Sequence, residues 1–121
     1  MAEHNTLGKV GEIKAKEYLE SKGYIIFHTN WRYKHKEIDL VALKNDILVF
    51  VEVKTRSFGG MQNARECITK SKMRFLIEAA DAYVTMFNRP EEVRFDLLAL
   101  TKSPSTIEIE HIENAFNALD I

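Results

Sequence analysis

Apolar positions along the chain follow two different periods, and these divide it into helices and strands. Apolar or small side chains recur every three or four residues over 7–22 and 64–88, which predicts two amphipathic helices. Gly23 is placed to end the first helix in the left-handed conformation, and Pro90 follows the end of the second. Runs rich in β-branched and aromatic residues predict five strands, over 24–31, 37–43, 47–54, 93–100 and 106–112.

The C-terminal segment 113–120 predicts a short third helix, with Phe116 and Leu119 available to cover the core. The element order is then α β β β α β β α, which is typical of an α/β fold with a mixed β-sheet of about five strands flanked by helices. A chain of 121 residues with no low-complexity segment is long enough for one hydrophobic core. We therefore expect a single domain over residues 1–121.

Two glycines fall in the first half of the first predicted helix. Gly8 and Gly11 each cost up to ~1 kcal/mol there relative to Ala, so they predict that another backbone packs closely against this part of the helix. Glu12 lies on the flank of the same apolar stripe, near the expected contact. A solvated glutamate is the alternative for that position.

The composition of the chain indicates in which kind of compartment the protein is expected, but it says little about the function. No apolar stretch approaches the ~18 residues needed to span a bilayer, and the N-terminus lacks the features of a signal peptide, so we expect a soluble, cytoplasmic protein. The single cysteine, Cys67, fits a reducing compartment and is expected to be a buried, inert thiol. The net charge of −1 neither supports nor excludes a nucleic-acid partner, but basic residues cluster at 33–36, 54–56 and 70–74.

Three charged residues lie inside segments that otherwise predict buried strands: Asp39, Glu52 and Lys54. Burial of an unpaired charge is costly, so their placement requires an explanation. If the turn at Asn45 and Asp46 has two residues, the numbers of opposed residues sum to 91, and Asp39 faces Glu52. A four-residue turn gives the same pairing, whereas a three-residue turn moves Glu52 to the opposite face from Asp39.

Two carboxylates crowded on an apolar sheet have few stable arrangements: one is protonated, a cation neutralises both, or the site is wet. Mg²⁺ prefers one or two carboxylates together with water and phosphate oxygens, which matches this pair. Lys54 could orient the attacking water and stabilise charge on a phosphate, as phosphodiester hydrolysis requires. The alternative is an exposed ladder of structural ion pairs, Glu37 with Lys54 and Asp39 with Arg56.

The segments "EIDLVA" and "VFVEVKTR" resemble the D-x(n)-E-x-K signature of the PD-(D/E)xK nuclease superfamily. With "GE" at 11–12, "GYIIFHTNWR" at 23–32 and "RFDLLAL" at 94–100, nearly the whole chain is similar to a small bacterial family of uncharacterised endonuclease-like proteins related to archaeal Holliday-junction resolvases. The resemblance implies a restriction-endonuclease-like fold, a Mg²⁺ or Mn²⁺ cofactor and a nucleic-acid partner, expected to be DNA. It leaves open whether the protein forms a homodimer, as resolvases do.

The resemblance also implies roles for individual residues. Asp39 and Glu52 match the metal-binding acids, with the backbone carbonyl of Val53 as a further ligand. Lys54 matches the catalytic lysine, and Glu12 matches an acid that supports the metal site. The basic residues expected to contact nucleic acid are Lys36, Arg56, Lys70 and Lys72.

Two positions depart from the pattern of that family. Lys36 stands where a glycine is usual, which affects the expected shape of the turn before the second strand. Phe75 stands where a basic residue is common, which weakens the expected contact with a DNA backbone along the second helix. Among the histidines, His28 and His111 are expected to be structural, and His35 could contact a phosphate.

Three functions remain compatible with the sequence. The first is a Mg²⁺-dependent DNA endonuclease, acting on branched or damaged DNA. The second is a non-catalytic nucleic-acid-binding protein with a nuclease-like fold, since a fold does not establish turnover. The third is a structural or interaction protein whose carboxylates form ion pairs. The sequence does not choose between DNA and RNA.

Overall fold

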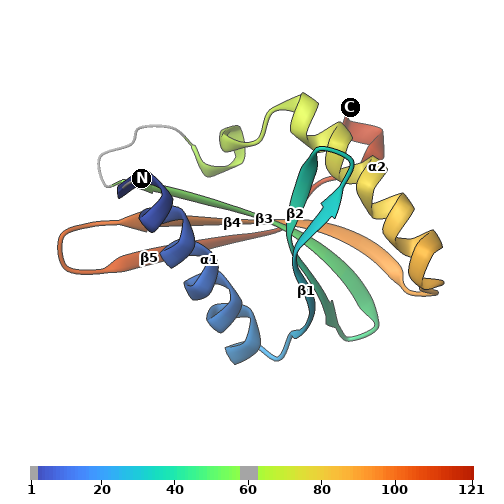
Figure 1. Cartoon of the computed structure of the whole chain (residues 1–121), viewed down its shortest axis with the longest axis horizontal. Coiled ribbons are helices and arrows are strands. Elements are labelled where there is room, and N and C mark those ends of the chain that lie inside the picture. The colour runs from blue at the N-terminus through green and yellow to red at the C-terminus, as the bar shows by residue number, and fades with distance from the viewer. Residues whose placement is uncertain (1–2, 58–62) are drawn as a thin grey trace.

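The computed structural model describes residues 3–57 and 63–121, which form a twisted sheet with a helix on each face (Figure 1). The elements in chain order are α1 (Glu3–Ser21), β1 (Ile25–Tyr33), β2 (Lys36–Lys44), β3 (Ile47–Ser57), the 3₁₀ helix η1 (Ala64–Cys67), α2 (Lys70–Phe87), β4 (Glu92–Lys102), β5 (Ile107–Phe116) and the 3₁₀ helix η2 (Ala118–Asp120). None of the helices in residues 3–57 and 63–121 combines the length and the apolar composition that crossing a membrane requires.

The five strands form one open sheet in the order β1-β2-β3-β4-β5. Neighbouring strands run antiparallel except β3 and β4, which are parallel because α2 carries the chain back between them. This mixed sheet flanked by helices confirms the predicted α/β fold class and is consistent with a restriction-endonuclease-like fold.

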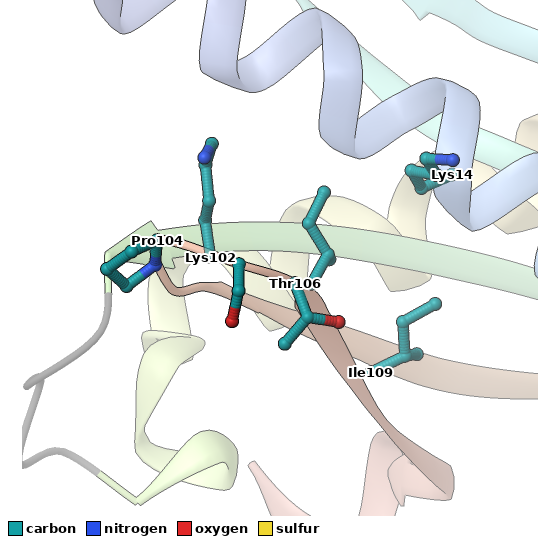
Figure 2. A pocket seen from close by; sticks show the side chains of 7 residues that line it. Lys14, Lys102, Pro104, Thr106 and Ile109 are labelled. Carbon is teal, nitrogen blue, oxygen red and sulfur yellow. The ribbon is translucent and has the colours of Figure 1, made fainter.

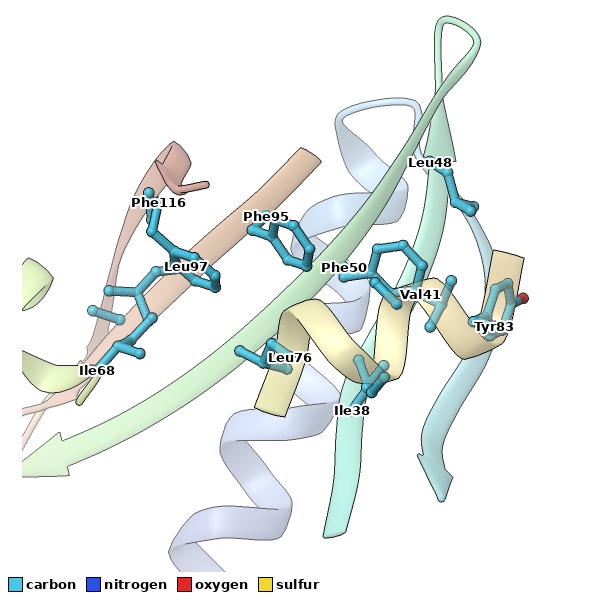
Figure 3. Packing of buried hydrophobic residues seen from close by; sticks show 14 of the residues in the cluster. Ile38, Val41, Leu48, Phe50, Ile68, Leu76, Tyr83, Phe95, Leu97 and Phe116 are labelled. Carbon is cyan, nitrogen blue, oxygen red and sulfur yellow. The ribbon is translucent and has the colours of Figure 1, made fainter. Parts of the chain in front are cut away.

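Each face of the sheet has its own hydrophobic core, because side chains alternate between the faces along every strand. On one face, Leu76 and Tyr83 of α2 pack against Phe50 and its neighbours (Figure 3). On the other face, Ala15 and Leu19 of α1 pack against valines and leucines of the central strands. With both faces covered, the inner strands are apolar on both sides, and a charged residue placed there is surrounded by apolar side chains.

The turn between β2 and β3 has two residues, which decides between the turn lengths that the sequence left open. Asn45 and Asp46 have φ angles of 49° and 66°, the left-handed conformation that a tight hairpin turn of this kind requires. The observed pairs run from Lys44 with Ile47 to Leu40 with Val51, so the numbers sum to 91, the register expected for a two-residue turn.

The helix predicted over 64–88 is in fact two helices. Ile68 has an extended backbone, and the side chain of Thr69 caps α2 by accepting a hydrogen bond from the backbone N–H of Lys72 at 3.1 Å. The capping bond satisfies a donor that would otherwise bond to the preceding turn, so α2 begins at Lys70. The predicted flexible loop over 57–63 lies mostly outside the described residues.

The helix predicted over 113–120 is wrong. Strand β5 continues to Phe116, which pairs with Phe95 of β4, and only Ala118–Asp120 form a 3₁₀ turn. Phe116 covers the core as expected, whereas Leu119 is 94 % exposed. Pairing with a neighbouring strand buries more of this segment than an isolated helical turn would, and it overrides the local helical pattern.

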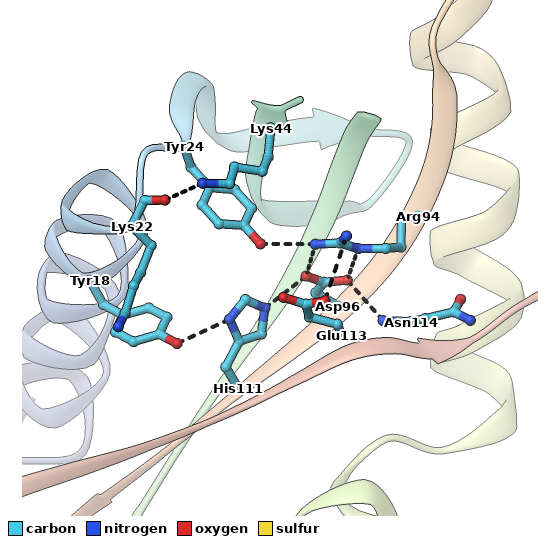
Figure 4. Close-up of polar contacts among 9 residues, drawn as sticks. All are labelled: Tyr18, Lys22, Tyr24, Lys44, Arg94, Asp96, His111, Glu113 and Asn114. Carbon is cyan, nitrogen blue, oxygen red and sulfur yellow. Dashed lines mark hydrogen bonds and ion pairs between the residues drawn. The ribbon is translucent and has the colours of Figure 1, made fainter. Parts of the chain in front are cut away.

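A polar network anchors α1 to β4 and β5 (Figure 4). Asp96 is completely buried, and its carboxylate accepts two bonds from Arg94, at 2.8 and 2.9 Å. It also contacts His111 Nε2 at 2.7 Å and accepts the Asn114 N–H at 3.0 Å. Burial alone would raise the pKa of Asp96, but the bonds from His111 and Arg94 lower it below its usual value.

Two tyrosines extend this network to the N-terminal part of the chain. Tyr18 of α1 contacts His111 Nδ1 through its hydroxyl group at 3.2 Å, and Tyr24 accepts a bond from Arg94 at 2.8 Å. On the opposite face of the sheet, His28 contacts the Tyr83 hydroxyl at 2.7 Å. The expectation that His28 and His111 are structural is confirmed.

The two glycines of α1 are predicted to respond in opposite directions to the same substitution. A Cβ atom at Gly11 would lie 2.0 Å from Thr55 Oγ1, so Gly11→Ala should lower the free energy of unfolding by about 2 kcal/mol. Nothing lies within 4 Å of the corresponding position at Gly8, so the close approach expected there is wrong. Gly8→Ala should raise stability by up to about 1 kcal/mol through helix propensity. Urea unfolding of both variants measures the contrast, and equal effects would contradict it.

The Asp96 network is predicted to fail in acid. Because the folded-state pKa of Asp96 is lowered, its stabilisation is present above the unfolded-state pKa and is lost as the pH falls through the folded-state value. Asp96→Asn should cost about 3 kcal/mol at pH 7 and flatten the acid limb of the stability curve. The matched control is Asp81→Asn, an exposed position of α2, which should change stability by less than about 0.5 kcal/mol. Thermal unfolding from pH 3 to pH 7 measures both.

Candidate functional site

Asp39 and Glu52 lie on adjacent strands, and their carboxyl groups meet through a hydrogen bond. Leu40 and Val51 are paired and both belong to the core beneath α1, so Glu52, which follows Val51, points to the α2 face and contacts Lys72. The strict alternation ends at Asp39, because Ile38 belongs to the core beneath α2 and Leu40 to the core beneath α1. The regular pairs end at this point, and Asp39 Oδ2 accepts the backbone N–H of Val53 at 2.7 Å. This bond fixes the orientation of the Asp39 carboxylate beside Glu52.

Burial and mutual repulsion prevent both acids from ionising freely. Glu52 is only 9 % exposed, and burial together with the charge of Asp39 raises its pKa to about 8. Burial also raises the pKa of Asp39, an effect opposed by the bond from Val53 and the charge of Lys72. The two carboxyl groups also interact through a hydrogen bond that favours protonated Glu52 and ionised Asp39. The pair therefore favours a state in which Glu52 carries the proton and Asp39 is ionised.

One buried oxygen of this pair lacks a hydrogen-bond partner. Glu52 Oε1 accepts no hydrogen bond, and Lys72 Nζ lies 3.7 Å from it, too far to donate one. A buried oxygen without a partner costs about 1–3 kcal/mol, so the position is suited to a cation that this oxygen could bind. Among residues 3–57 and 63–121 no cluster of three or more His, Cys, Asp or Glu side chains could hold a metal ion. Two carboxylates still match the preference of Mg²⁺ for a site completed by water and phosphate oxygens.

Glu12 approaches the pair from α1. Its Oε1 atom lies 3.5 Å from Asn30 Nδ2, and its negative charge raises the pKa of Asp39. The close packing of Gly11 on Thr55 of β3 holds this turn of the helix against the sheet. The structure thus brings Glu12, which is distant in sequence, within electrostatic reach of Asp39.

The predicted basic residues fall into two groups. Lys54 is exposed, and its charge lowers the pKa of Glu52, so it lies near the pair. Lys72 Nζ lies 3.7 Å from Glu52 Oε1. The ammonium groups of Lys36 and Lys72 lie 5.6 and 5.4 Å, respectively, from the ring centre of Phe75, so both lysines contact this ring.

The other two predicted contacts, Arg56 and Lys70, lie elsewhere. Arg56 donates to Thr101 Oγ1 at 3.1 Å and contacts the half-buried Cys67 sulfur at 3.7 Å, so it ties β3 to β4 and η1. Lys70 is exposed at the start of α2.

The alternative of a structural ion-pair ladder does not match the observed partners. Glu37 pairs with Arg32 of β1 at 3.6 Å, and Asp39 accepts the Val53 N–H. Glu52 contacts Lys72 of α2. The acids of β2 and β3 therefore use partners other than those in the expected ladder.

The sequence did not predict two features of the structure, one near the acid pair and one at the end of the sheet. The first is the contact of Phe75 with the Lys36 ammonium, which joins the two positions that depart from the family pattern. The second is a groove of about 450 Å³ between α1 and the β4–β5 turn, lined by Lys14, Lys102, Thr106 and Ile109 among others (Figure 2). Lys102 pairs with Ser57 at the end of the sheet. Only the turn-forming "KSPST" segment signalled the hairpin that forms one wall of this groove.

The fold and the site together define an α/β protein whose five-stranded mixed sheet carries a buried pair of acids beside two lysines. Residues 11–100 match the model of the uncharacterised protein family UPF0102, and the chain belongs to this family. A UPF0102 protein of Bacteroides fragilis, BF0634, is 47 % identical over 116 residues, covering 96 % of each chain. A UPF0102 protein of Parabacteroides distasonis is 44 % identical over 118 residues, covering 98 % of each chain.

The buried acid pair is predicted to lower stability at high pH in the absence of divalent ions. Because the folded-state pKa of Glu52 is raised, its contribution is fully present below the unfolded-state pKa of 4.5 and is lost as the pH rises through about 8. Glu52→Gln removes this loss, and each pKa unit corresponds to about 1.4 kcal/mol. The variant should therefore be more stable than the wild type at pH 9 by more than about 1.4 kcal/mol.

The control for this measurement is Glu37→Gln, which removes an exposed acid from β2. Chemical unfolding in EDTA at pH 4, 6.5 and 9 should show a difference that grows with pH for Glu52→Gln alone. A Glu52→Gln variant that is less stable than the wild type at pH 9 would contradict the assigned burial cost and favour a structural role for the acid.

Proposed function

We propose that this chain is a Mg²⁺-dependent DNA endonuclease that hydrolyses phosphodiester bonds in branched or damaged DNA. The observation that carries the proposal is the contact between the carboxyl groups of Asp39 and Glu52, with Glu52 Oε1 buried and without a hydrogen-bond partner. A fold that left this oxygen unsatisfied for no purpose would lose stability. The same unsatisfied oxygen is useful in a site where a divalent ion replaces the proton of Glu52 and binds to that oxygen.

Asp39, Glu52 and the backbone carbonyl of Val53 would hold the ion, with Mn²⁺ as an alternative to Mg²⁺. When bound, a divalent ion neutralises the two carboxylates and polarises a phosphate oxygen. Glu52 must release its proton for binding, so the raised pKa of Glu52 opposes loading below about pH 8. The hydrogen bond from the Val53 N–H orients Asp39 and lowers its pKa, which opposes the effect of burial and favours the ionised carboxylate that a divalent ion binds.

The neighbouring charges have separate roles in the proposed reaction. Lys54 is exposed at the rim of the site, where its ammonium group can donate to a phosphate oxygen and orient the attacking water. The charge of Lys72, 3.7 Å from Glu52 Oε1, favours the ionised form of Glu52, and its ammonium group can turn to a phosphate when a divalent ion is bound. Glu12 adds negative charge near Asp39 and thereby favours a cation at the pair.

A second candidate is a nucleic-acid-binding protein that does not cut. The observation that favours it is the contact of Lys72 with Glu52, because a lysine that remains there neutralises the acid without a divalent ion. The two candidates differ in metal dependence. Binding alone requires the basic residues and weakens steeply with salt, but it requires neither Asp39 nor Mg²⁺.

Cleavage of a labelled four-way junction and of a matched linear duplex, each with Mg²⁺, with Mn²⁺ and with EDTA, tests the proposal. The wild type should cut only when a divalent ion is present. Asp39→Asn and Lys54→Met should each reduce cleavage by about 100-fold or more, because each removes a charge that acts on the reacting phosphate. Lys16→Met, an exposed lysine of α1, is the matched control and should cut at the wild-type rate.

Calorimetric titration with Mg²⁺ separates loss of the ion from loss of chemistry. Asp39→Asn should abolish the binding heat, whereas Lys54→Met should retain it. Cleavage that persists in EDTA, or in Asp39→Asn, would overturn the nuclease proposal. Salt-sensitive binding of DNA without cutting under either ion would support the binding protein instead.

A further inference from the structure

A row of aromatic side chains leads from the acid pair to the β1–β2 hairpin, which lies beside α2 (Figure 1). The rings of Trp31 and Tyr33 are nearly parallel, with centres 6.2 Å apart and an interplanar angle of 9°. Tyr33 is followed by Phe75 of α2, with ring centres 6.1 Å apart. Trp31 is anchored by Tyr83 at 5.1 Å, whereas Tyr33 and Phe75 are half-buried at the margin of the core.

Two ammonium groups converge on the outer end of this row. Lys36 and Lys72 lie 5.6 and 5.4 Å from the centre of the Phe75 ring, and Lys72 also lies 3.7 Å from Glu52 Oε1. An unbroken series of contacts therefore links Glu52, Lys72, Phe75 and Tyr33. The row ends at the candidate site and not at a distant surface.

The positive charges of Lys36 and of the neighbouring Lys34 have different partners. Lys34, in the same hairpin, is held by Glu78 at 2.7 Å. Lys36 makes no ion pair with any side chain of the described residues, and its charge is stabilised by the face of Phe75 instead. Cation–π contact at an exposed site is worth only about 0.5–1 kcal/mol, so the ammonium group can be transferred to a stronger anionic partner.

Half-exposed rings flanked by lysines match the chemistry of one ligand class. Proteins that bind single-stranded nucleic acid combine aromatic rings that stack on bases with cations that contact the backbone. In an intact duplex each base is already stacked on its neighbours and paired, so its face is not available to a protein ring. Only an unpaired base, at a branch, a gap or a single-stranded end, can use such a site.

We propose that Tyr33 and Phe75 form a stacking site for an unpaired nucleobase, with Lys36 and Lys72 contacting the phosphates on either side of that base. The inference rests on the proposed function for its choice of a nucleic acid as the ligand. It specifies the substrate class as a nucleic acid with an unpaired nucleotide next to the bond that is cut. Because every base has an aromatic face, the site selects structure and not sequence.

The test compares two single-stranded oligonucleotides of equal length, one of thymidines and one in which the central positions are abasic. Both carry the same phosphate charge, so a difference in affinity measures contact with the bases. In EDTA, which removes any dependence on metal or cleavage, the wild type should bind the thymidine strand about tenfold more tightly. Phe75→Leu and Tyr33→Leu should each remove most of this preference. Fluorescence anisotropy measures the affinity of each of the three proteins for each strand.

Three control variants isolate the role of the rings. Phe87→Leu makes the same change on the last turn of α2, where the ring packs on Tyr83 and has no lysine over it, and it should keep the preference. Tyr33→Phe loses only the hydrogen bond to Glu78 and should also keep it. Lys16→Ala, which removes an exposed lysine of α1, should leave the preference unchanged. Circular dichroism of each variant verifies the fold.

The inference and the proposed function fail in different ways. Equal affinity of the wild type for the two strands, or a preference that survives in both Phe75→Leu and Tyr33→Leu, would overturn the stacking site. Metal-dependent cleavage of a fully paired duplex would still support the nuclease in that case. Preference for the thymidine strand without any cutting would retain the stacking site and reject the nuclease.

Discussion

The tight turn at Asn45 and Asp46 sets the register of β2 against β3, and the geometry of the acid pair depends on that register. Two residues with positive φ angles close the hairpin, and every pair along it follows. A slip of one residue would send Asp39 or Glu52 to the other face, because side chains alternate along a strand. One local conformational requirement thus determines whether two acids that are 13 positions apart share a site.

The sheet carries two buried acids in opposite electrostatic states. Asp96 accepts bonds from Arg94, His111 and Asn114, and its pKa is lowered. Glu52 has an oxygen with no hydrogen-bond partner, and its pKa is raised. Both side chains are buried, with Asp96 0 % and Glu52 9 % exposed, so burial alone does not account for the opposite pKa shifts. Asp96 contributes to holding the fold together, whereas Glu52 is a cost to the fold that a ligand or a proton must offset.

The two departures from the family pattern are connected in space. Phe75 of α2 stands where a basic residue is common, so α2 carries one cation fewer. Lys36 of β2 lies over the ring of Phe75 and supplies a cation at the same place. The local positive charge is thereby kept while an aromatic face is added beside it. The expectation that Phe75 weakens contact with nucleic acid considered α2 alone, and the neighbouring hairpin changes that conclusion. Lys72, which also lies over the Phe75 ring, links this cluster to Glu52.

From the sequence alone the facing of Asp39 and Glu52 stayed open, because the turn could have two, three or four residues. The sequence by itself did determine the period of each element and the place of the hairpin turn at Asn45 and Asp46. These features are local, since they depend on residues within one strand or one hairpin. Tertiary structure alone decided that β5 continues to Phe116, that Asp96 is satisfied by His111, and that Lys36 meets Phe75. Each of these depends on packing between segments distant in the chain, where partner strands and facing helices override local preference and a single sequence carries no record of the contact.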